Sequence, residues 1–234
     1  MKKNIVFKIG GSVIYDKALN INEEFLKKLK SWYVGTKKDY QKVIMVVGGG
    51  SLSRELQDKI APSVGGEKYL HSIGMSVTNT NANLVKAYLE DENIYIPTKL
   101  GDAYEFLVSE GEKRMISGGL KIGWSTDMDA ALFADILEES KLYMISNVDY
   151  IYDKDPNKDE DAKAIKEMTW DEYFDLFNIQ EDSTHTPNNS IPVDVECARF
   201  CSHKGISIWF TGGEKIIQED TIENVLESGT LVHP

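Results

Sequence analysis

The sequence has few of the features that place a protein outside the ordinary globular class. Its 234 residues include two cysteines, too few for a framework of disulfides. No apolar run approaches the roughly 20 residues of a membrane-spanning helix, and the lysines of MKKNIVFKIGGS lead into a charged strand, not into the apolar core of a signal peptide. Positive charge is scarce, since 26 Lys and Arg residues face 38 Asp and Glu residues. We therefore expect a cytoplasmic protein whose main partner is a small molecule and neither a nucleic acid nor a membrane.

The sequence does contain a regular alternation of β-branched runs and helical patterns. Short apolar segments predict strands at residues 4–9, 41–47, 93–97, 113–117, 141–146 and 206–210. Helical periodicity is clearest at residues 21–32, 126–140 and 193–205, the last ending at a glycine suited to a left-handed cap. Because parallel strands need crossover connections, this order predicts an α/β fold with a mostly parallel sheet covered by helices on both faces.

Glycine-rich or polar turns follow four of the predicted strands. In sheets of this kind, ligands bind beyond the carboxyl ends of the strands. These ends share one edge of the sheet, so we expect the four turns to form a common binding site. The turns are GGS, GGGS, GGLKIGWSTD and NVDYIYDKDP.

The first strand, in VFKIGGSVI, carries a lysine among apolar residues. Lys8 has two explanations: it lies on an edge strand and its stem reaches toward water, or the strand presents its ammonium group to an anionic ligand. Because the protein carries a net charge of −12, any anionic ligand has to meet local positive charge.

The second turn, in VVGGGSLSREL, places three glycines between a strand and a helix expected to begin near Ser51. Glycines let backbone N–H groups approach a ligand closely, and a helix N-terminus favours an anion such as phosphate. A Walker A sequence is absent, and a dinucleotide-binding pattern lacks its acidic ribose partner. Arg54 follows one helical turn later, where it either clasps phosphate oxygens or pairs with Asp58 on the surface.

The segment GGLKIGWSTDMDAALF adds hydroxyls and carboxylates at the start of another predicted helix. Ser125, Thr126 and Asp127 form an ordinary capping sequence, but a hydroxyl that caps a helix can still donate to phosphate, so the two interpretations are compatible. Asp129 supplies a further carboxylate. Phosphoryl transfer needs the donor and acceptor held in line and their negative charge neutralised. A lysine, glycine amides, an arginine, hydroxyls and aspartates together suit that chemistry.

The two cysteines, Cys197 and Cys201, are four residues apart, which places them on one helical face and suits buried thiols. With His203 nearby, a metal site is the alternative.

Six segments together resemble the amino acid kinase superfamily and, within it, the archaeal type of uridylate (UMP) kinase. They are KIGGSVI, VVGGGSLSREL, SIGMSVTNTNANLV, GGLKIGWSTDMDAAL, ISNVDYIYDKDP and IPVDVECA, in family order and at family-like spacing. The resemblance implies a three-layer αβα sandwich forming a single domain over residues 1–234, with an acceptor-side lobe at about 1–120 and an ATP-side lobe at about 121–234. It also implies transfer of the γ-phosphoryl group of ATP, with Mg²⁺, to UMP or a similar acceptor in pyrimidine metabolism, by a homo-oligomer that is often a hexamer.

The resemblance also assigns residues. The implied catalytic set is Lys8, which bridges the donor and acceptor phosphates, Asp194, which steadies that lysine, and Asp127. The implied acceptor-binding residues are Gly48, Gly49, Gly50, Arg54, His71, Gly74, Ser125 and Thr126. The implied ATP-binding residues are Lys8, Gly10, Gly11, Ser12, Asn147, Asp149, Tyr152, Asp155 and Pro156. No residue is assigned as a direct metal ligand.

The sequence departs from the family pattern mainly on the acceptor side. His71 stands where uridylate kinases usually place an aspartate that grips the ribose hydroxyls, and a neutral imidazole cannot accept two hydroxyl protons as a carboxylate does. Either His71 is a half-buried residue without chemistry, or the pocket accepts a ligand other than a pyrimidine nucleotide. Convergence of His71 with His185 would favour an oxyanion or a different phosphate. Asn79 replaces a frequent arginine, and Tyr150 replaces the glycine of NVDG.

Two alternatives to a uridylate kinase follow. The first keeps the fold and the transfer reaction but uses a different small phosphorylated or carboxylated acceptor. The second is a protein that binds nucleotide or oxyanion without transfer, similar to the molybdenum storage proteins.

Overall fold

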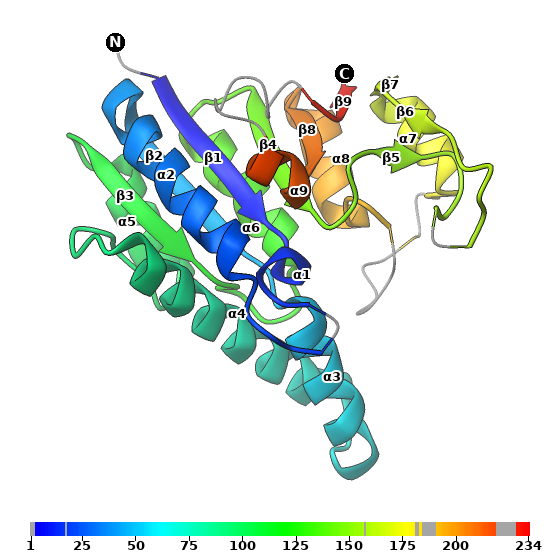
Figure 1. Cartoon of the computed structure of the whole chain (residues 1–234), viewed down its shortest axis with the longest axis horizontal. Helices are drawn as coiled ribbons and strands as arrows, with labels where there is room; N and C mark the ends of the chain where they lie inside the picture. Colours follow the sequence, from blue (N-terminus) through cyan, green and yellow to red (C-terminus); the bar gives the residue numbers. More distant parts are fainter. Residues whose placement is uncertain (1–2, 17, 157, 181–182, 184–190, 219–227) are drawn as a thin grey trace.

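The computed structural model describes residues 3–16, 18–156, 158–180, 183, 191–218 and 228–234 (Figure 1). Its strands are β1 (Lys3–Ile9), β2 (Tyr40–Val47), β3 (Lys113–Ser117), β4 (Lys141–Ser146), β5 (Ile151–Tyr152), β6 (Ala164–Ile165), β7 (Glu167–Thr169), β8 (Ser207–Gly212) and β9 (Thr230–His233). Its helices are α1 (Gly11–Ile14), α2 (Glu23–Asp39), α3 (Gly50–Ile60), α4 (Glu67–Leu89), α5 (Leu100–Val108), α6 (Thr126–Ile136), α7 (Trp170–Leu176), α8 (Val195–Lys204) and α9 (Gly213–Gln218), with a short 3₁₀ turn at Ala61–Ser63.

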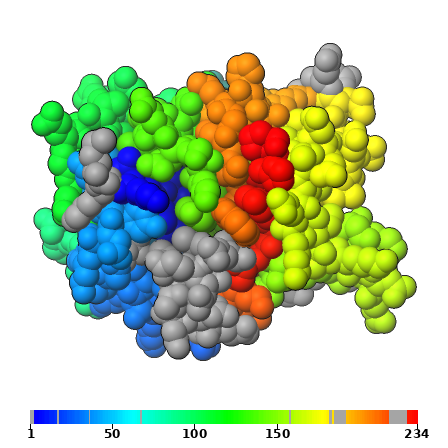
Figure 2. Space-filling view, turned by 90° about the horizontal axis from the view of Figure 1, so that it is seen from above, coloured from blue at the N-terminus to red at the C-terminus, as the bar shows by residue number. Residues whose placement is uncertain are grey.

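Seven strands form one sheet in the order β3-β2-β1-β4-β8-β9-β7. All neighbouring strands are parallel except β8 and β9, which are antiparallel. Figure 2 shows the C-terminal strand β9, in red, between the orange and yellow segments, as this order requires. The mostly parallel α/β sheet predicted from the alternating pattern is confirmed.

Side chains of the central strands alternate between two hydrophobic cores. In β1, Phe7 belongs to one core and Val6 to the other, because successive residues of a strand face opposite sides of a sheet. The core of Phe7 also contains Phe25 of α2 and buried residues of α4, whereas the core of Val6 contains Phe133 of α6 and buried residues of α8. Helices therefore cover both faces, which confirms the three-layer sandwich.

Several element boundaries differ from the sequence prediction. The segment 93–97 is not a strand, because Tyr95 alone pairs with Met115 and Pro97 has no N–H group to continue a ladder. Strands β5, β6, β7 and β9 have two to four residues each, too few for a periodic pattern, and were not predicted. The predicted cap at Gly205 is confirmed by its φ of 69°.

The two cysteines are structural. Cys197 and Cys201 are buried on one face of α8, with their Sγ atoms 4.0 Å apart, whereas His203 is exposed. Within the described ranges, no three His, Cys, Asp or Glu residues gather into a metal-binding group. The metal interpretation of this segment is therefore wrong.

No helix in the described part of the chain combines the length and apolar character needed to cross a membrane.

A buried tyrosine holds the chain just before the predicted catalytic Asp194. Tyr173 of α7 donates its hydroxyl to the carbonyl of Val193 at 2.7 Å and accepts the N–H group of Val193 at 2.8 Å. The hydroxyl thus satisfies both backbone groups of one buried residue.

Tyr173→Phe should lower the free energy of unfolding by about 1–3 kcal/mol, because it leaves a buried donor and acceptor unpaired. Urea unfolding measures the change, with Tyr104→Phe, at an exposed tyrosine, as the control. Equal midpoints for the two variants would contradict this role.

Candidate active site

The predicted site centres on an ion pair between β1 and α6. Lys8 Nζ lies 2.7 Å from Asp127 Oδ1, and the two side chains are only 17% and 12% exposed. Strand β1 pairs with β2 on one side and β4 on the other, so the edge-strand explanation of Lys8 is wrong. A charge at a central strand needs a partner, which Asp127 supplies.

Asp194 connects the N-termini of two helices. As the N-cap of α8, its Oδ1 accepts the N–H groups of Glu196 and Cys197, and its Oδ2 accepts the hydroxyl of Ser125, which itself caps α6. The N–H group of Asp194 also donates to Asp127 Oδ2 at 3.3 Å. Asp194 thus supports the carboxylate that holds Lys8, and its implied role in steadying the lysine stays a prediction.

The capping interpretation of the Ser-Thr-Asp sequence is confirmed. Ser125 Oγ accepts the N–H group of Met128 at 3.0 Å. The first turn of α6, which carries the partial positive charge of a helix N-terminus, lies beside Lys8, because its residue Asp127 contacts the ammonium group.

The two glycine turns predicted for donor and acceptor form one unit. A Cβ atom on Gly11 would lie 2.3 Å from the N atom of Gly50, and a Cβ atom on Gly50 would lie 2.2 Å from the carbonyl carbon of Gly11. Gly50 also has a φ of +62°, in the left-handed region that favours glycine. Only glycine fits this backbone-to-backbone contact, so the turns after β1 and β2 hold each other in place.

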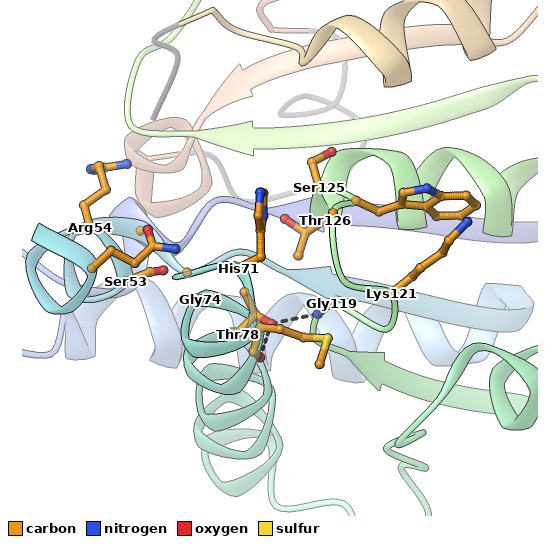
Figure 3. A pocket seen from close by; sticks show the side chains of 15 residues that line it. Ser53, Arg54, His71, Gly74, Thr78, Gly119, Lys121, Ser125 and Thr126 are labelled. Carbon is orange, nitrogen blue, oxygen red and sulfur yellow. Dashed lines mark hydrogen bonds between the residues drawn. The ribbon is translucent and has the colours of Figure 1, made fainter. Parts of the chain in front are cut away.

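Beside the glycine turns lies a pocket of about 200 Å³, shown in Figure 3. Seven of the eight predicted acceptor-binding residues line it: Gly49, Gly50, Arg54, His71, Gly74, Ser125 and Thr126. Gly48, the eighth, lies directly behind, where an added Cβ would be 3.5 Å from Thr126 Oγ1. The sequence prediction therefore brought together residues from α3, α4 and α6.

The described lining of the pocket is basic. Arg54 and Lys121 lie on opposite sides in Figure 3 with His71 between them, and this lining contains no Asp or Glu. Arg54 is exposed and forms no ion pair with Asp58, so the surface-pair interpretation is wrong. The pocket supplies the local positive charge that an anionic ligand needs in an acidic protein.

The structure shows where the three residues that depart from the family pattern lie, namely His71, Asn79 and Tyr150. His71 is half-buried in α4, and His185 lies outside the described residues, so their convergence stays untested. The side-chain amide of Asn79 donates to Met75 O and Gly119 O, which ties α4 to the turn after β3. The ring of Tyr150 packs edge-on against Tyr152.

Two of the predicted ATP-side residues, Asp149 and Tyr152, lie near each other beyond β4 and β8. Asp149 lies against Gly212, where a Cβ atom would be 1.9 Å from Asp149 Oδ1. Lys215 Nζ of α9 is 3.9 Å from Asp149 Oδ2. Burial, and then the nearby charge of Asp149, raise the pKa of Tyr152.

The other predicted ATP-binding residues lie in the turn after β1, directly after β4, or in the loop that contains Asp155. Gly10 caps α1 and donates to Ile145 O at 2.7 Å, with Gly11 and Ser12 in the helix that follows. Asn147 follows β4, whereas Asp155 pairs with Lys158 in the more distant loop that also contains Pro156. None of these residues lines the basic pocket.

Sequence reasoning missed three basic or aromatic residues. Lys121 Nζ lies 3.7 Å from the ring centroid of Trp124, and both residues line the pocket. They belong to the GGLKIGWSTD turn, so the position of that turn was a signal for them. Lys215 follows the pair Gly212 and Gly213 after β8, a further glycine turn at the same edge.

The comparisons with known proteins agree with this fold. Residues 3–212 match the model of the amino acid kinase family, so the chain belongs to this family. Uridylate kinase of Thermococcus kodakarensis is 31% identical over 231 residues, covering 98% of this chain and 99% of that protein. Uridylate kinase of Methanobrevibacter smithii is 35% identical over 187 residues, covering 78% and 79%.

Solved structures confirm the fold. The structure of uridylate kinase from Archaeoglobus fulgidus matches with a TM-score of 0.72 at 20% identity, covering 97% of this chain and 100% of that one. The structure of UMP kinase from Ureaplasma parvum matches with a TM-score of 0.71 at 22% identity, covering 100% of both chains.

Asp129 is a buried carboxyl group below the turn after β3. Its Oδ2 accepts the N–H group of Leu120 at 3.2 Å, and its Oδ1 has no hydrogen-bond partner in the described structure. Burial raises the pKa of Asp129 to about 7, with Lys121 lowering it and Asp194 raising it.

Asp129→Asn tests this ionisation. Between pH 3.8, the ordinary pKa of an aspartate, and about pH 7, Asp129 keeps a proton in the folded protein that it has lost in the unfolded chain. The stabilising contribution of this proton is therefore complete below pH 3.8 and is lost as the pH rises through about 7. The unfolding free energy of the wild type should therefore fall relative to that of Asp129→Asn over this window, by up to about 4 kcal/mol. Urea unfolding at several pH values measures the difference, and a constant difference would contradict the raised pKa.

Proposed function

We propose that the protein is an ATP-dependent kinase of the uridylate kinase type. It transfers the γ-phosphoryl group of ATP to the phosphate of UMP or a similar acceptor. The observation that carries this proposal is the Lys8–Asp127 pair at the junction of the two glycine turns, next to a basic pocket. Membership of the amino acid kinase family and the near full-length similarity to archaeal uridylate kinases support it.

Lys8 is the group that would stabilise the transferring phosphoryl group. Negative charge spreads over the phosphoryl oxygens in the transition state, and a fixed cation nearby lowers its energy without reorganising at the moment of reaction. Asp127 fixes the ammonium group at 2.7 Å, and Asp194 fixes Asp127 through its backbone. The charge is thus placed before the substrates bind.

The turn at Gly48, Gly49 and Gly50 would hold the acceptor phosphate. The first backbone N–H groups of α3 have no helical partner, and together with Arg54 they offer several donors to phosphate oxygens. Thr126, at the start of α6, adds a hydroxyl close to Gly48 of the same turn. Reaction in line follows when acceptor and donor are held on the two sides of Lys8.

The described residues suit a magnesium ion that arrives with the nucleotide. Mg²⁺ keeps several waters and commonly binds substrate phosphates with one or two carboxylates. Within the described ranges, no group of three carboxylate, His or Cys ligands forms a protein cage. When bound, the ion would neutralise charge on the triphosphate, while Lys8 and the glycine amides act on the transferring group.

The proposal also includes three expectations that rest on the resemblance and the composition. They are a single domain with lobes at about 1–120 and 121–234, a homo-oligomeric assembly and a cytoplasmic location. The sheet itself runs through both lobes, because β1 pairs with β2 and with β4.

An assay of ADP release across nucleoside monophosphates and other small phosphate esters, with Mg²⁺ and ATP, tests the function. UMP or a related phosphate monoester should support turnover. Lys8→Ala should lower kcat by about 10²–10³-fold while circular dichroism stays unchanged, because it removes a preorganised charge. Lys141→Ala, at the amino end of neighbouring β4, is the control. Silence with every acceptor would overturn the proposal and favour a nucleotide-binding protein without transfer.

Arg54→Ala should act mainly on the acceptor. Loss of a charged hydrogen bond is worth about 1.5–3 kcal/mol, so KM for the acceptor should rise about 10–100-fold with a smaller change in KM for ATP. Lys59→Ala, on the same helix and paired with Glu55, is the matched control. Steady-state kinetics measures the two KM values separately, and an equal rise in KM for ATP would contradict a role of Arg54 in binding the acceptor.

A further inference from the structure

A buried asparagine of α4 lies directly behind the glycine turn. Asn81 is 0% exposed, and its side-chain amide donates to the carbonyl of Gly48 at 2.8 Å and to the carbonyl of Gly49 at 3.3 Å. Its Oδ1 accepts the hydroxyl of Tyr15 at 3.0 Å. The side chain therefore joins α4, the turn after β2 and the residue after α1, and it does not line the pocket.

These bonds fix the direction of two peptide groups. In a trans peptide, the C=O and N–H groups point to opposite sides of the peptide plane. Because the carbonyls of Gly48 and Gly49 point toward Asn81, the N–H groups of the same two peptides, which belong to Gly49 and Gly50, point away from it. Gly49 and Gly50 line the pocket, and their N–H groups have no hydrogen-bond partner within the described residues.

A turn made of glycines needs contacts that hold its peptide groups in one orientation. A turn of three glycines has many accessible backbone conformations, and without a tie its N–H groups would rotate away from a ligand. The contact between Gly11 and Gly50 fixes one side of the turn, and the N–H group of Ser53 donates to Gly49 O at 3.3 Å where α3 begins. Asn81 holds Gly48 O at 2.8 Å and shares Gly49 O with Ser53. Tyr15 in turn orients Asn81, because its donated hydroxyl identifies which end of the side chain is the oxygen.

We propose that Asn81, oriented by Tyr15, is a positioning residue that aims the N–H groups of Gly49 and Gly50 at the acceptor phosphate. This inference rests on the proposed function for the identity of the ligand, but its structural part concerns the chain alone. Asn81 acts through the glycine turn, and Tyr15 acts through Asn81.

Steady-state kinetics on the full chain tests the proposal. Asn81→Ala should raise KM for UMP tenfold or more and change KM for ATP less than threefold. A merely structural role predicts another result, since partial unfolding lowers the apparent kcat and leaves the KM of the folded fraction unchanged. Asn83→Ala is the matched control, because Asn83 lies two residues on in α4 and its side chain donates only to Asn79 O among the described contacts.

Tyr15→Phe provides a gentler variant that keeps the test valid if Asn81→Ala folds poorly. It should raise KM for UMP severalfold, and adding it to Asn81→Ala should give no further rise, because the two residues act in series. Additive effects, or an unchanged KM for UMP in Asn81→Ala, would overturn the positioning role.

A crystal structure of Asn81→Ala separates this inference from the proposed function. The carbonyl of Gly48 should turn or become disordered, while Gly49 O keeps its bond from the N–H group of Ser53, and Asn83→Ala should leave both carbonyls unchanged. Peptide planes that stay in place would overturn the inference whatever the activity, whereas a wild type that turns over no acceptor contradicts only the proposed function.

Discussion

The site depends on one buried ion pair in the middle of the sheet. A lysine on a central strand loses most of its hydration, and the opposite charge of Asp127 compensates for this loss. Asp127 is held by the first turn of α6 and by the N–H group of Asp194 at the start of α8. The position of the ammonium group is therefore set by three elements far apart in the sequence.

The two glycine turns show how the fold brings distant parts of the sequence together at one edge of the sheet. Parallel strands bring their carboxyl ends to one edge, and the turns after β1 and β2 then touch through backbone atoms alone. Glycine is required at positions 11 and 50 because a Cβ atom at either one would collide with the backbone of the other turn. The basic pocket beside them also explains how a protein of net charge −12 can receive an anion.

Much of this arrangement could be predicted from sequence because it follows local rules. The alternating pattern predicted the sheet, and the glycine turns predicted the edge at which seven residues predicted to bind the acceptor line one pocket. Other features depend on tertiary contacts without a local signal. Asn81 looks like one polar residue among several in α4, and only the fold places it behind Gly48. The short strands β7 and β9 likewise exist through their pairing with each other and with β8.

A crystal structure with UMP and a non-hydrolysable ATP analogue tests the central claim most directly. The account predicts that Lys8 Nζ lies within hydrogen-bond distance of phosphate oxygens, with the acceptor phosphate against Gly49 and Gly50. Phosphates bound at the opposite end of the sheet, or directed away from the ammonium group of Lys8, would contradict it.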